Sequence, residues 1–209
     1  MERDVLLKAA EECGFETCGA LDVGTLRALP EVRQMCEVNT CGAYGKRWSC
    51  PPGCGSIEEC EEKMKRYKKG ILVQTVGDIE DTMDWEGIMA VKEEHDKRFL
   101  NLIEKIRNIA DESACLYKEN SAELGALNSG SGAFGKASGE NEGFLPLGDG
   151  YCGRCKECTY PDSPCRFPDR SMSSMEAFGL FVSDVCRKNG IAYNYGPGKM
   201  CYTGCVLFN

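Results

Sequence analysis

The sequence predicts an α+β fold, in which a small mixed sheet is flanked by helices and interrupted by two cysteine-rich loops. The chain has 209 residues, a length that suits one domain spanning 1–209. Helical and strand-like patterns follow each other without the regular alternation of a parallel α/β protein. The chain also contains 15 cysteines but one histidine, and many of the cysteines fall in loops rich in proline and glycine.

Four elements are predicted in the N-terminal half. Apolar residues at helical spacing predict a helix over 2–13, and weak alternation predicts a strand over 17–23. A capping-box sequence that begins at Ser56 opens a helix over 57–69. The apolar, partly β-branched run 71–76 is the clearest strand in the chain.

The next predicted element is a long helix. An apolar stripe predicts it over 84–111, and His95 is expected on its surface or at its boundary. Residues 125–150 are rich in glycine and serine, so a flexible loop is predicted there. A second capping box opens a helix over 173–190. Two short strands complete the predicted sheet, over 191–195 and 202–208.

Charge and composition narrow the function. Acidic residues outnumber basic ones by 33 to 25, which argues against a broad nucleic-acid face and against an anionic membrane surface. The chain begins without a signal-peptide pattern and has no apolar run of membrane-spanning length, so a cytoplasmic location is expected. Because thiols stay reduced in the cytoplasm, clustered cysteines there are predicted to bind metal rather than to form disulfides. The basic run 63–69 predicts a solvated helix face or a docking patch for an acidic partner.

The strongest motif lies in the loop 151–170. Three cysteines recur every third residue and a fourth follows after six more residues: Cys152, Cys155, Cys158 and Cys165. Ferredoxin-type loops present thiolates to the corners of a cubane in this way, so the loop is predicted to be ferredoxin-like and to hold a [4Fe-4S] cluster. A four-cysteine zinc site is the alternative, although zinc ligands more often come as two separated pairs.

A second constellation lies upstream, in a loop with several glycines and prolines. Its predicted ligands are Cys36, Cys41, Cys50 and Cys54, which could hold a second [4Fe-4S] cluster, a zinc ion or no metal. Three other cysteines could supply the fourth ligand in place of Cys54: Cys60, Cys201 and Cys205. The last two could equally be buried packing residues of a terminal strand. Four more cysteines are expected to pack in helices or strands: Cys13, Cys18, Cys115 and Cys186.

Both motifs, and the run from Ser173 to Gly179, resemble the prokaryotic predicted metal-binding proteins grouped as domain-of-unknown-function family 2284. The resemblance covers most of the chain. It implies metal or iron–sulfur binding and no particular reaction. The family pattern is similar to this chain at Cys36, Cys41, Cys50 and the four downstream cysteines, whereas Cys54, Cys201 and Cys205 are less typical of it.

Three functions therefore compete. The first is an oxygen-sensitive electron carrier with one or two [4Fe-4S] clusters, whose overall acidity suits docking on a basic redox partner protein. The second is an enzyme whose first cluster has three protein ligands, so that an open iron binds substrate as a Lewis acid. The third is a structural zinc module for protein interactions. The sequence predicts neither the oligomeric state nor the reduction potential.

Overall fold

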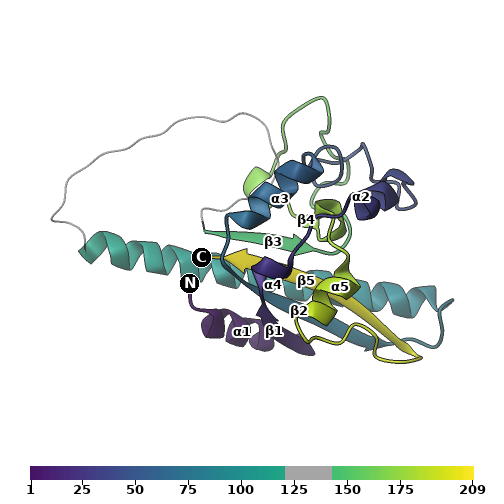
Figure 1. Ribbon diagram of the computed structural model, residues 1–209, viewed down its shortest axis with the longest axis horizontal. Helices are drawn as coiled ribbons and strands as arrows, with labels where there is room; N and C mark the ends of the chain where they lie inside the picture. The colour runs from purple at the N-terminus through teal and green to yellow at the C-terminus, as the bar shows by residue number, and fades with distance from the viewer. Residues whose placement is uncertain (121–142) are drawn as a thin grey trace.

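The computed structural model describes residues 1–120 and 143–209, and it describes side chains as far as residue 112 and again from 143. It confirms the α+β class, with helices on both faces of a five-stranded mixed sheet (Figure 1). The strands are β1 (Thr17–Leu21), β2 (Lys69–Asp78), β3 (Phe144–Gly148), β4 (Ser173–Ser174) and β5 (Lys199–Phe208). Their order across the sheet is β1-β2-β5-β3-β4, and only the β3–β4 pair is parallel.

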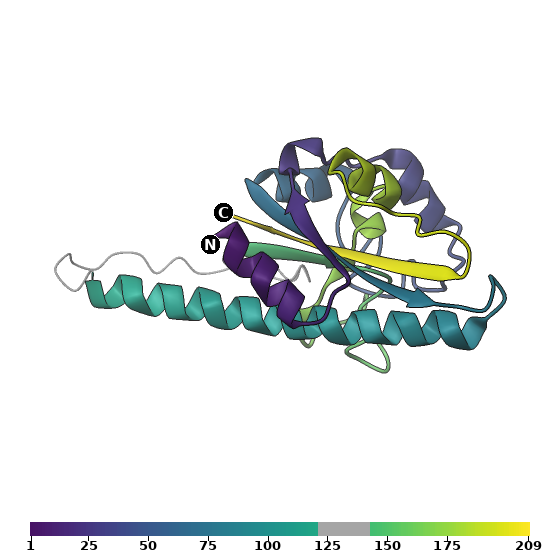
Figure 2. The ribbon, with the colours of Figure 1, turned by 90° about the horizontal axis from the view of Figure 1, so that it is seen from below.

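The helices cover the sheet unevenly. They are α1 (Arg3–Glu12), α2 (Pro30–Glu37), α3 (Ile57–Lys65), α4 (Trp85–Asn120) and α5 (Val182–Lys188), with short 3-10 helices η1 (Val23–Thr25), η2 (Pro168–Arg170) and η3 (Glu176–Phe178). In Figure 2, α1 and the long α4 lie under one face of the sheet, while the shorter helices lie over the other. Among the described residues, no helix combines the length and apolarity needed to cross a bilayer.

Strand alternation builds one hydrophobic core on each face. Ile71 and Val73 of β2 pack with α1 and α4, whereas Leu72 between them packs with α3, η3 and α5. All three side chains are fully buried, and burying each one stabilises the fold by about 1.5–3 kcal/mol. The pattern that marked this run as a strand thus also fixes which helices lie on which side.

The first capping box forms as predicted. The Ser56 hydroxyl accepts a hydrogen bond from the Glu59 amide at 3.1 Å, and the Glu59 carboxylate accepts one from the Ser56 amide at 2.9 Å. Two amide groups at the helix end are satisfied in this way. The helix starts where the sequence placed it and ends four residues earlier, because β2 begins at Lys69.

The prediction of one continuous helix over 173–190 is wrong, because the structure has the short η3 and the separate α5 there. Ser174 accepts a hydrogen bond from the Ala177 amide at 3.0 Å, but this cap supports only η3. Gly179 then adopts a left-handed conformation, with φ of 77°, and turns the chain before α5. A β-carbon added at Gly179 would lie 3.1 Å from the Leu29 nitrogen, so the glycine also permits close packing on the residues that precede α2.

Two other predictions need correction. The strand predicted over 191–195 is irregular chain, held by side-chain hydrogen bonds such as that from Gln74 Nε2 to the Ala192 carbonyl at 2.9 Å. In the predicted loop 125–150, residues 125–142 lie outside the described residues, but 144–148 form the fully buried strand β3. Its apolar run is short and lies among glycines, which concealed the strand signal.

Candidate metal centre

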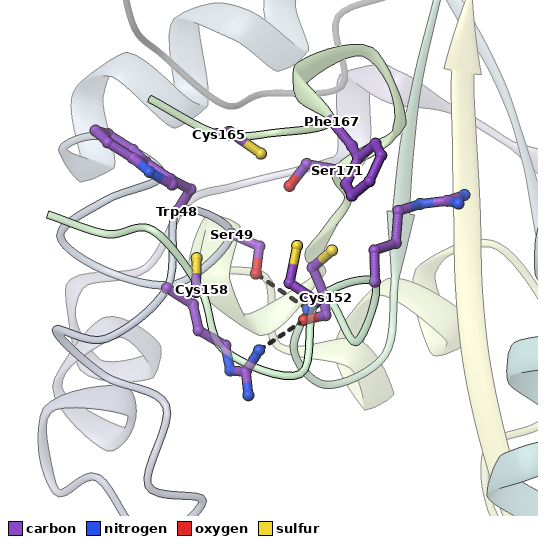
Figure 3. A pocket seen from close by; sticks show the side chains of 10 residues that line it. Trp48, Ser49, Cys152, Cys158, Cys165, Phe167 and Ser171 are labelled. Atoms are coloured by element: carbon purple, nitrogen blue, oxygen red, sulfur yellow. Dashed lines mark hydrogen bonds between the residues drawn. The ribbon is translucent and has the colours of Figure 1, made fainter. Parts of the chain in front are cut away.

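The four cysteines of the C-terminal loop line one small cavity of about 20 Å³ (Figure 3). We call Cys152, Cys155, Cys158 and Cys165 the quartet. Burial raises the pKa of the Cys165 thiol, and the three neighbouring thiols raise it further. The electrostatic influence of the other three thiols on Cys165 agrees with their placement around the same cavity.

Trp48, from the upstream cysteine loop, closes one side of this cavity. Its indole nitrogen donates a hydrogen bond to the Ser163 carbonyl at 3.1 Å. Its ring packs edge-on against Tyr160, with ring centroids 4.9 Å apart. The shape of the quartet loop therefore depends on the upstream loop as well as on its own prolines.

Three of the four upstream cysteines lie together at a much larger pocket. Cys36, at the end of α2, lines a pocket of about 700 Å³ with Cys41 and Cys50, and we call these three the triad. Burial raises the pKa of Cys50 to about 11, and the nearby thiols of Cys41 and Cys36 also raise it. The triad thus opens on space of the size that small-molecule pockets usually have.

Cys54 does not join the triad. Its side chain is 2% exposed and packs in the core beneath α3, where the thiol donates to the Ala177 carbonyl at 3.7 Å. Cys60, the reserve ligand, lies beside it and accepts a hydrogen bond from the Arg33 guanidinium at 3.2 Å. Its hydrogen bond with Cys54, together with the Arg33 charge, lowers the pKa of Cys60 to about 7. These two cysteines form a separate buried pair.

The remaining cysteines also divide. Cys201 lies on β5 and lines the triad pocket, so by position it is an alternative fourth ligand. Cys205, on the same strand, is completely buried in the core. Cys186 is buried in that core as well, as predicted, whereas Cys13 and Cys18 are only partly buried against the opposite one. The side chain of Cys115 lies outside the described residues.

One protein-family profile matches most of the chain. The profile of the family described as "Predicted metal-binding protein (DUF2284)" matches residues 19–126 and 134–208. The chain belongs to this family. None of the curated proteins matches it, and none of the solved structures does. Membership in DUF2284 identifies the chain as a predicted metal-binding protein and leaves open which metal it holds.

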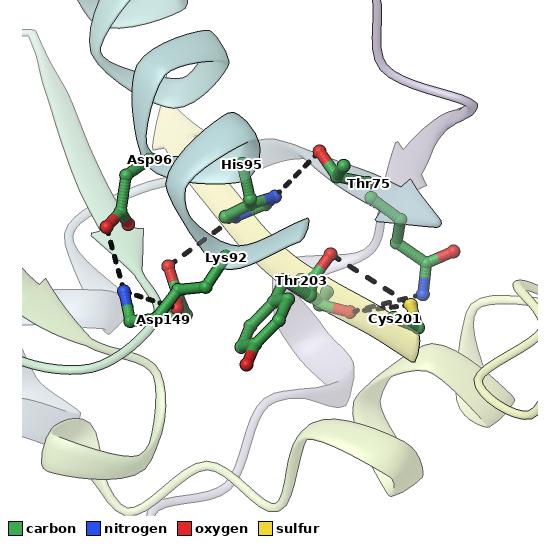
Figure 4. Close-up of polar contacts among 9 residues, drawn as sticks. Thr75, Lys92, His95, Asp96, Asp149, Cys201 and Thr203 are labelled. Atoms are coloured by element: carbon green, nitrogen blue, oxygen red, sulfur yellow. Dashed lines mark hydrogen bonds and ion pairs between the residues drawn. The ribbon is translucent and has the colours of Figure 1, made fainter. Parts of the chain in front are cut away.

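In this DUF2284 protein, charged side chains form one part of the wall of the triad pocket, which is otherwise largely apolar. Lys92 lies 2.8 Å from the Asp96 carboxylate and 3.1 Å from that of Asp149 (Figure 4). Burial lowers the pKa of Lys92, but the two carboxylates outweigh it and raise the pKa overall. Glu176 also lines the pocket, and burial raises the pKa of its carboxyl group. The pocket thus holds one compensated cation and a carboxyl group that protonates readily.

His95 lies behind this wall and is neither the surface residue nor the boundary residue that the sequence predicted. It is 0% exposed, and its Nδ1 lies 3.1 Å from the Thr75 hydroxyl (Figure 4). Its Nε2 faces the Asp149 carboxylate at 3.8 Å without a hydrogen bond. Burial lowers the pKa of His95 to about 4. Its acidic sequence neighbours suggested a solvated residue, but its ring packs between those of Phe15 and Phe99.

The quartet and the triad adjoin each other. A cavity of about 690 Å³ is lined by both Cys41 and Cys152. The Ser49 hydroxyl accepts a hydrogen bond from the Cys152 amide at 3.0 Å and lies 3.8 Å from the Cys50 sulfur. Since the Ser49 oxygen is already an acceptor, its own hydrogen can be donated to that sulfur. One buried serine therefore connects a ligand of each predicted centre.

The donor sets fit sulfur-ligated metal. Within residues 1–112 and 143–209, no three histidine, cysteine or acidic side chains converge closely enough to hold a single ion. The quartet thiols line one small cavity, and no histidine or acidic side chain lines it with them. Sequence reasoning identified the thiols from their spacing, but it missed Lys92, Asp149 and Ser49. The only signal for them was their proximity to cysteines or, for Lys92, an i,i+4 pair with Asp96.

Proposed function

We propose that this protein is an iron–sulfur redox protein in which the quartet holds a [4Fe-4S] cluster and exchanges electrons with a second centre at the triad. The observation that carries the proposal is the placement of all four quartet thiols around one cavity, with no nitrogen or carboxylate ligand among its lining residues. Sulfur-only ligation of this kind supports iron–sulfur chemistry. The oxygen sensitivity of such a cluster agrees with the expected cytoplasmic location.

The arrangement of the two sites supports internal electron transfer. Ser49 is 1% exposed and contacts both Cys152 and Cys50, so no bulk water separates the two ligand sets at this point. A quartet cluster would supply one-electron chemistry. The surrounding residues Trp48 and Phe167 would limit the access of water to it, which influences its potential.

Metal analysis tests the proposal directly. The protein is purified anaerobically, and iron, zinc and acid-labile sulfide are measured together with the visible absorption before and after exposure to air. We expect iron and sulfide in near-equal amounts and a colour that bleaches in air. A colourless protein with stoichiometric zinc and no sulfide would overturn the proposal and favour the structural zinc module.

A second function is favoured by one specific observation. The triad offers three thiols to a pocket of about 700 Å³, while Cys54 faces the core. A cluster held by three cysteines would keep one iron open toward the pocket, where a substrate could bind to it as to a Lewis acid. Glu176 would lie within this pocket as a proton donor.

Electron paramagnetic resonance of the reduced protein, with and without cyanide, separates this enzyme from a simple carrier. Cyanide should shift the signal of the triad centre and leave that of the quartet centre unchanged. The Cys201→Ser variant serves as the control for a fourth cysteine ligand. If cyanide shifts the signal only in this variant, Cys201 occupies the fourth position and the open-iron enzyme is excluded.

A further inference from the structure

The quartet region differs in charge from the rest of the molecule. The whole chain has 25 basic and 33 acidic residues, but residues 151–171 together with Lys46 and Arg47 contain six basic and three acidic ones. The remainder therefore has 19 basic and 30 acidic residues. An otherwise acidic protein is locally basic around its four-cysteine site.

Backbone hydrogen bonds hold these cations in place. Arg154 donates to the Arg170 carbonyl at 2.6 Å, and Arg166 donates to the Glu157 carbonyl at 2.8 Å. A neutral carbonyl oxygen fixes a guanidinium group without cancelling its charge, so a positive potential persists at the surface. Lys156 lies between two quartet cysteines and is exposed.

Exposed aromatic rings accompany the cations. Phe167 lines the quartet cavity and is still 45% exposed, and Tyr151 is 46% exposed. The Arg47 guanidinium lies 4.3 Å from the centre of the Tyr151 ring. Aromatic residues and arginine are the types enriched at protein interfaces, where a few such side chains carry most of the binding energy.

The other basic stretch of the chain is built differently. In the run 63–69, Lys63 is 7% exposed, and Lys65 pairs with Glu61 at 3.0 Å. This stretch closes a helix that is acidic at its other end, so its charges are partly balanced. It also lies at the end of α3, in the turn that follows and at the first residue of β2, outside the quartet loop.

We propose that the surface around the quartet, which we call the quartet face (Arg47, Tyr151, Arg154, Lys156, Arg166 and Phe167), docks a small acidic electron-carrier protein. The proposal rests on the proposed function, since it makes the quartet the entry point for electrons. The reduced carrier loses one electron and the quartet centre gains it, with no bond made or broken. Opposite charges draw the carrier in and place its centre over the aromatic patch. The overall acidity predicts a basic partner, whereas the quartet face selects an acidic one.

Reduction kinetics test the docking site. The probe is a small acidic ferredoxin, chemically reduced and mixed with the oxidised protein in a stopped-flow instrument. The Lys156→Glu/Arg166→Glu variant changes two charges on the quartet face. The matched control, Lys8→Glu/Lys68→Glu, makes the same change in net charge at exposed lysines of α1 and of the segment after α3. We expect the second-order rate constant to fall about tenfold or more in the first variant, to stay near the wild-type value in the control, and to fall with salt in the wild type.

A second measurement keeps the docking proposal separate from the proposed function. Binding of the oxidised ferredoxin is followed by isothermal titration calorimetry, which needs no electron transfer and works whichever metal the protein contains. The single variant Lys156→Glu is included in case loss of the Arg166 hydrogen bond disturbs the loop. Equal weakening by both double variants, or binding that does not respond to salt, would overturn the docking site. Normal docking without iron or sulfide would overturn the proposed function alone.

Discussion

The quartet and the triad were predicted from the same kind of motif, yet the structure assembles them in different ways. The quartet lies within 14 consecutive residues, and all four of its thiols reach one small cavity. The upstream set spans 19 residues that include the end of α2 and a loop, and only three of its thiols line a common pocket, which is large. The spacing of residues along the sequence determines where the ligands of a single-loop site lie. In a site built between separate elements, the tertiary packing of those elements determines where they lie.

The largest expected effect is a loss of metal when a quartet cysteine is replaced, which tests whether the quartet and the upstream set are built differently. Cys155→Ser should abolish metal binding at the quartet and leave the triad centre in place, so iron per chain should fall by about half if both sites hold equal clusters. Cys54→Ser should leave iron content unchanged and destabilise the fold by about 1–3 kcal/mol, because it places a hydroxyl in an apolar core. Iron and sulfide assays combined with urea unfolding measure both effects. If Cys54→Ser loses as much iron as Cys155→Ser, then Cys54 is a ligand and the two sites are alike.

A backbone change should affect one site only. Gly179 has a φ of 77° and packs against Leu29 and Ile57, next to the start of α2 and α3. Alanine there introduces a strained conformation and a steric conflict, so Gly179→Ala should cost about 1–3 kcal/mol and reduce metal at the triad more than at the quartet. Gly190→Ala is the matched control, because Gly190 has a φ of 71° but open space around it. Equal effects of both variants on the triad would show that packing at Gly179 does not position it.

The sequence predicted more of the quartet than of the triad for a physical reason. Spacing within a loop constrains where its side chains can point, and the quartet therefore followed from its motif. Whether Cys54 faces the pocket or the core depends on how α3 lies on η3, and short-range patterns contain no such information. The same limit applies to the fold. The β2 strand and the α3 cap have strong local signals, whereas the turn at Gly179 and the buried strand β3 depend on neighbours distant in sequence.

The burial of His95 behind the triad pocket makes the stability of the fold depend on pH. Since the folded state holds His95 neutral, with a pKa of about 4, the unfolded chain binds more protons between this value and the usual 6.5. Stability should therefore fall as the pH falls, by about 2 kcal/mol between pH 7 and pH 5 from this group. Asp96 and Glu176 have raised pKa values and act in the opposite direction.

Comparison with His95→Gln isolates the histidine contribution, because both carboxyl groups remain. Free energies of unfolding are measured from urea titrations at several pH values, for wild type and variant in parallel. The wild type should lose about 2 kcal/mol more than the variant between pH 7 and pH 5. Parallel profiles would show that His95 is solvated or already charged in the folded protein, and the polar wall behind the triad would need another explanation.

The smallest expected effect concerns the link between the two centres. Ser49 can donate a hydrogen bond to the Cys50 sulfur while it accepts one from the Cys152 amide. A hydrogen bond to a ligand thiolate stabilises the more negative, reduced state of a centre. Ser49→Ala should therefore lower the potential of the triad centre, by ~40 mV if the bond contributes about 1 kcal/mol. Ser49→Thr keeps the hydroxyl and should restore the potential. A potential that stays unchanged in Ser49→Ala, at full iron content, would show that Ser49 only braces the loop and that the two centres are coupled through space alone.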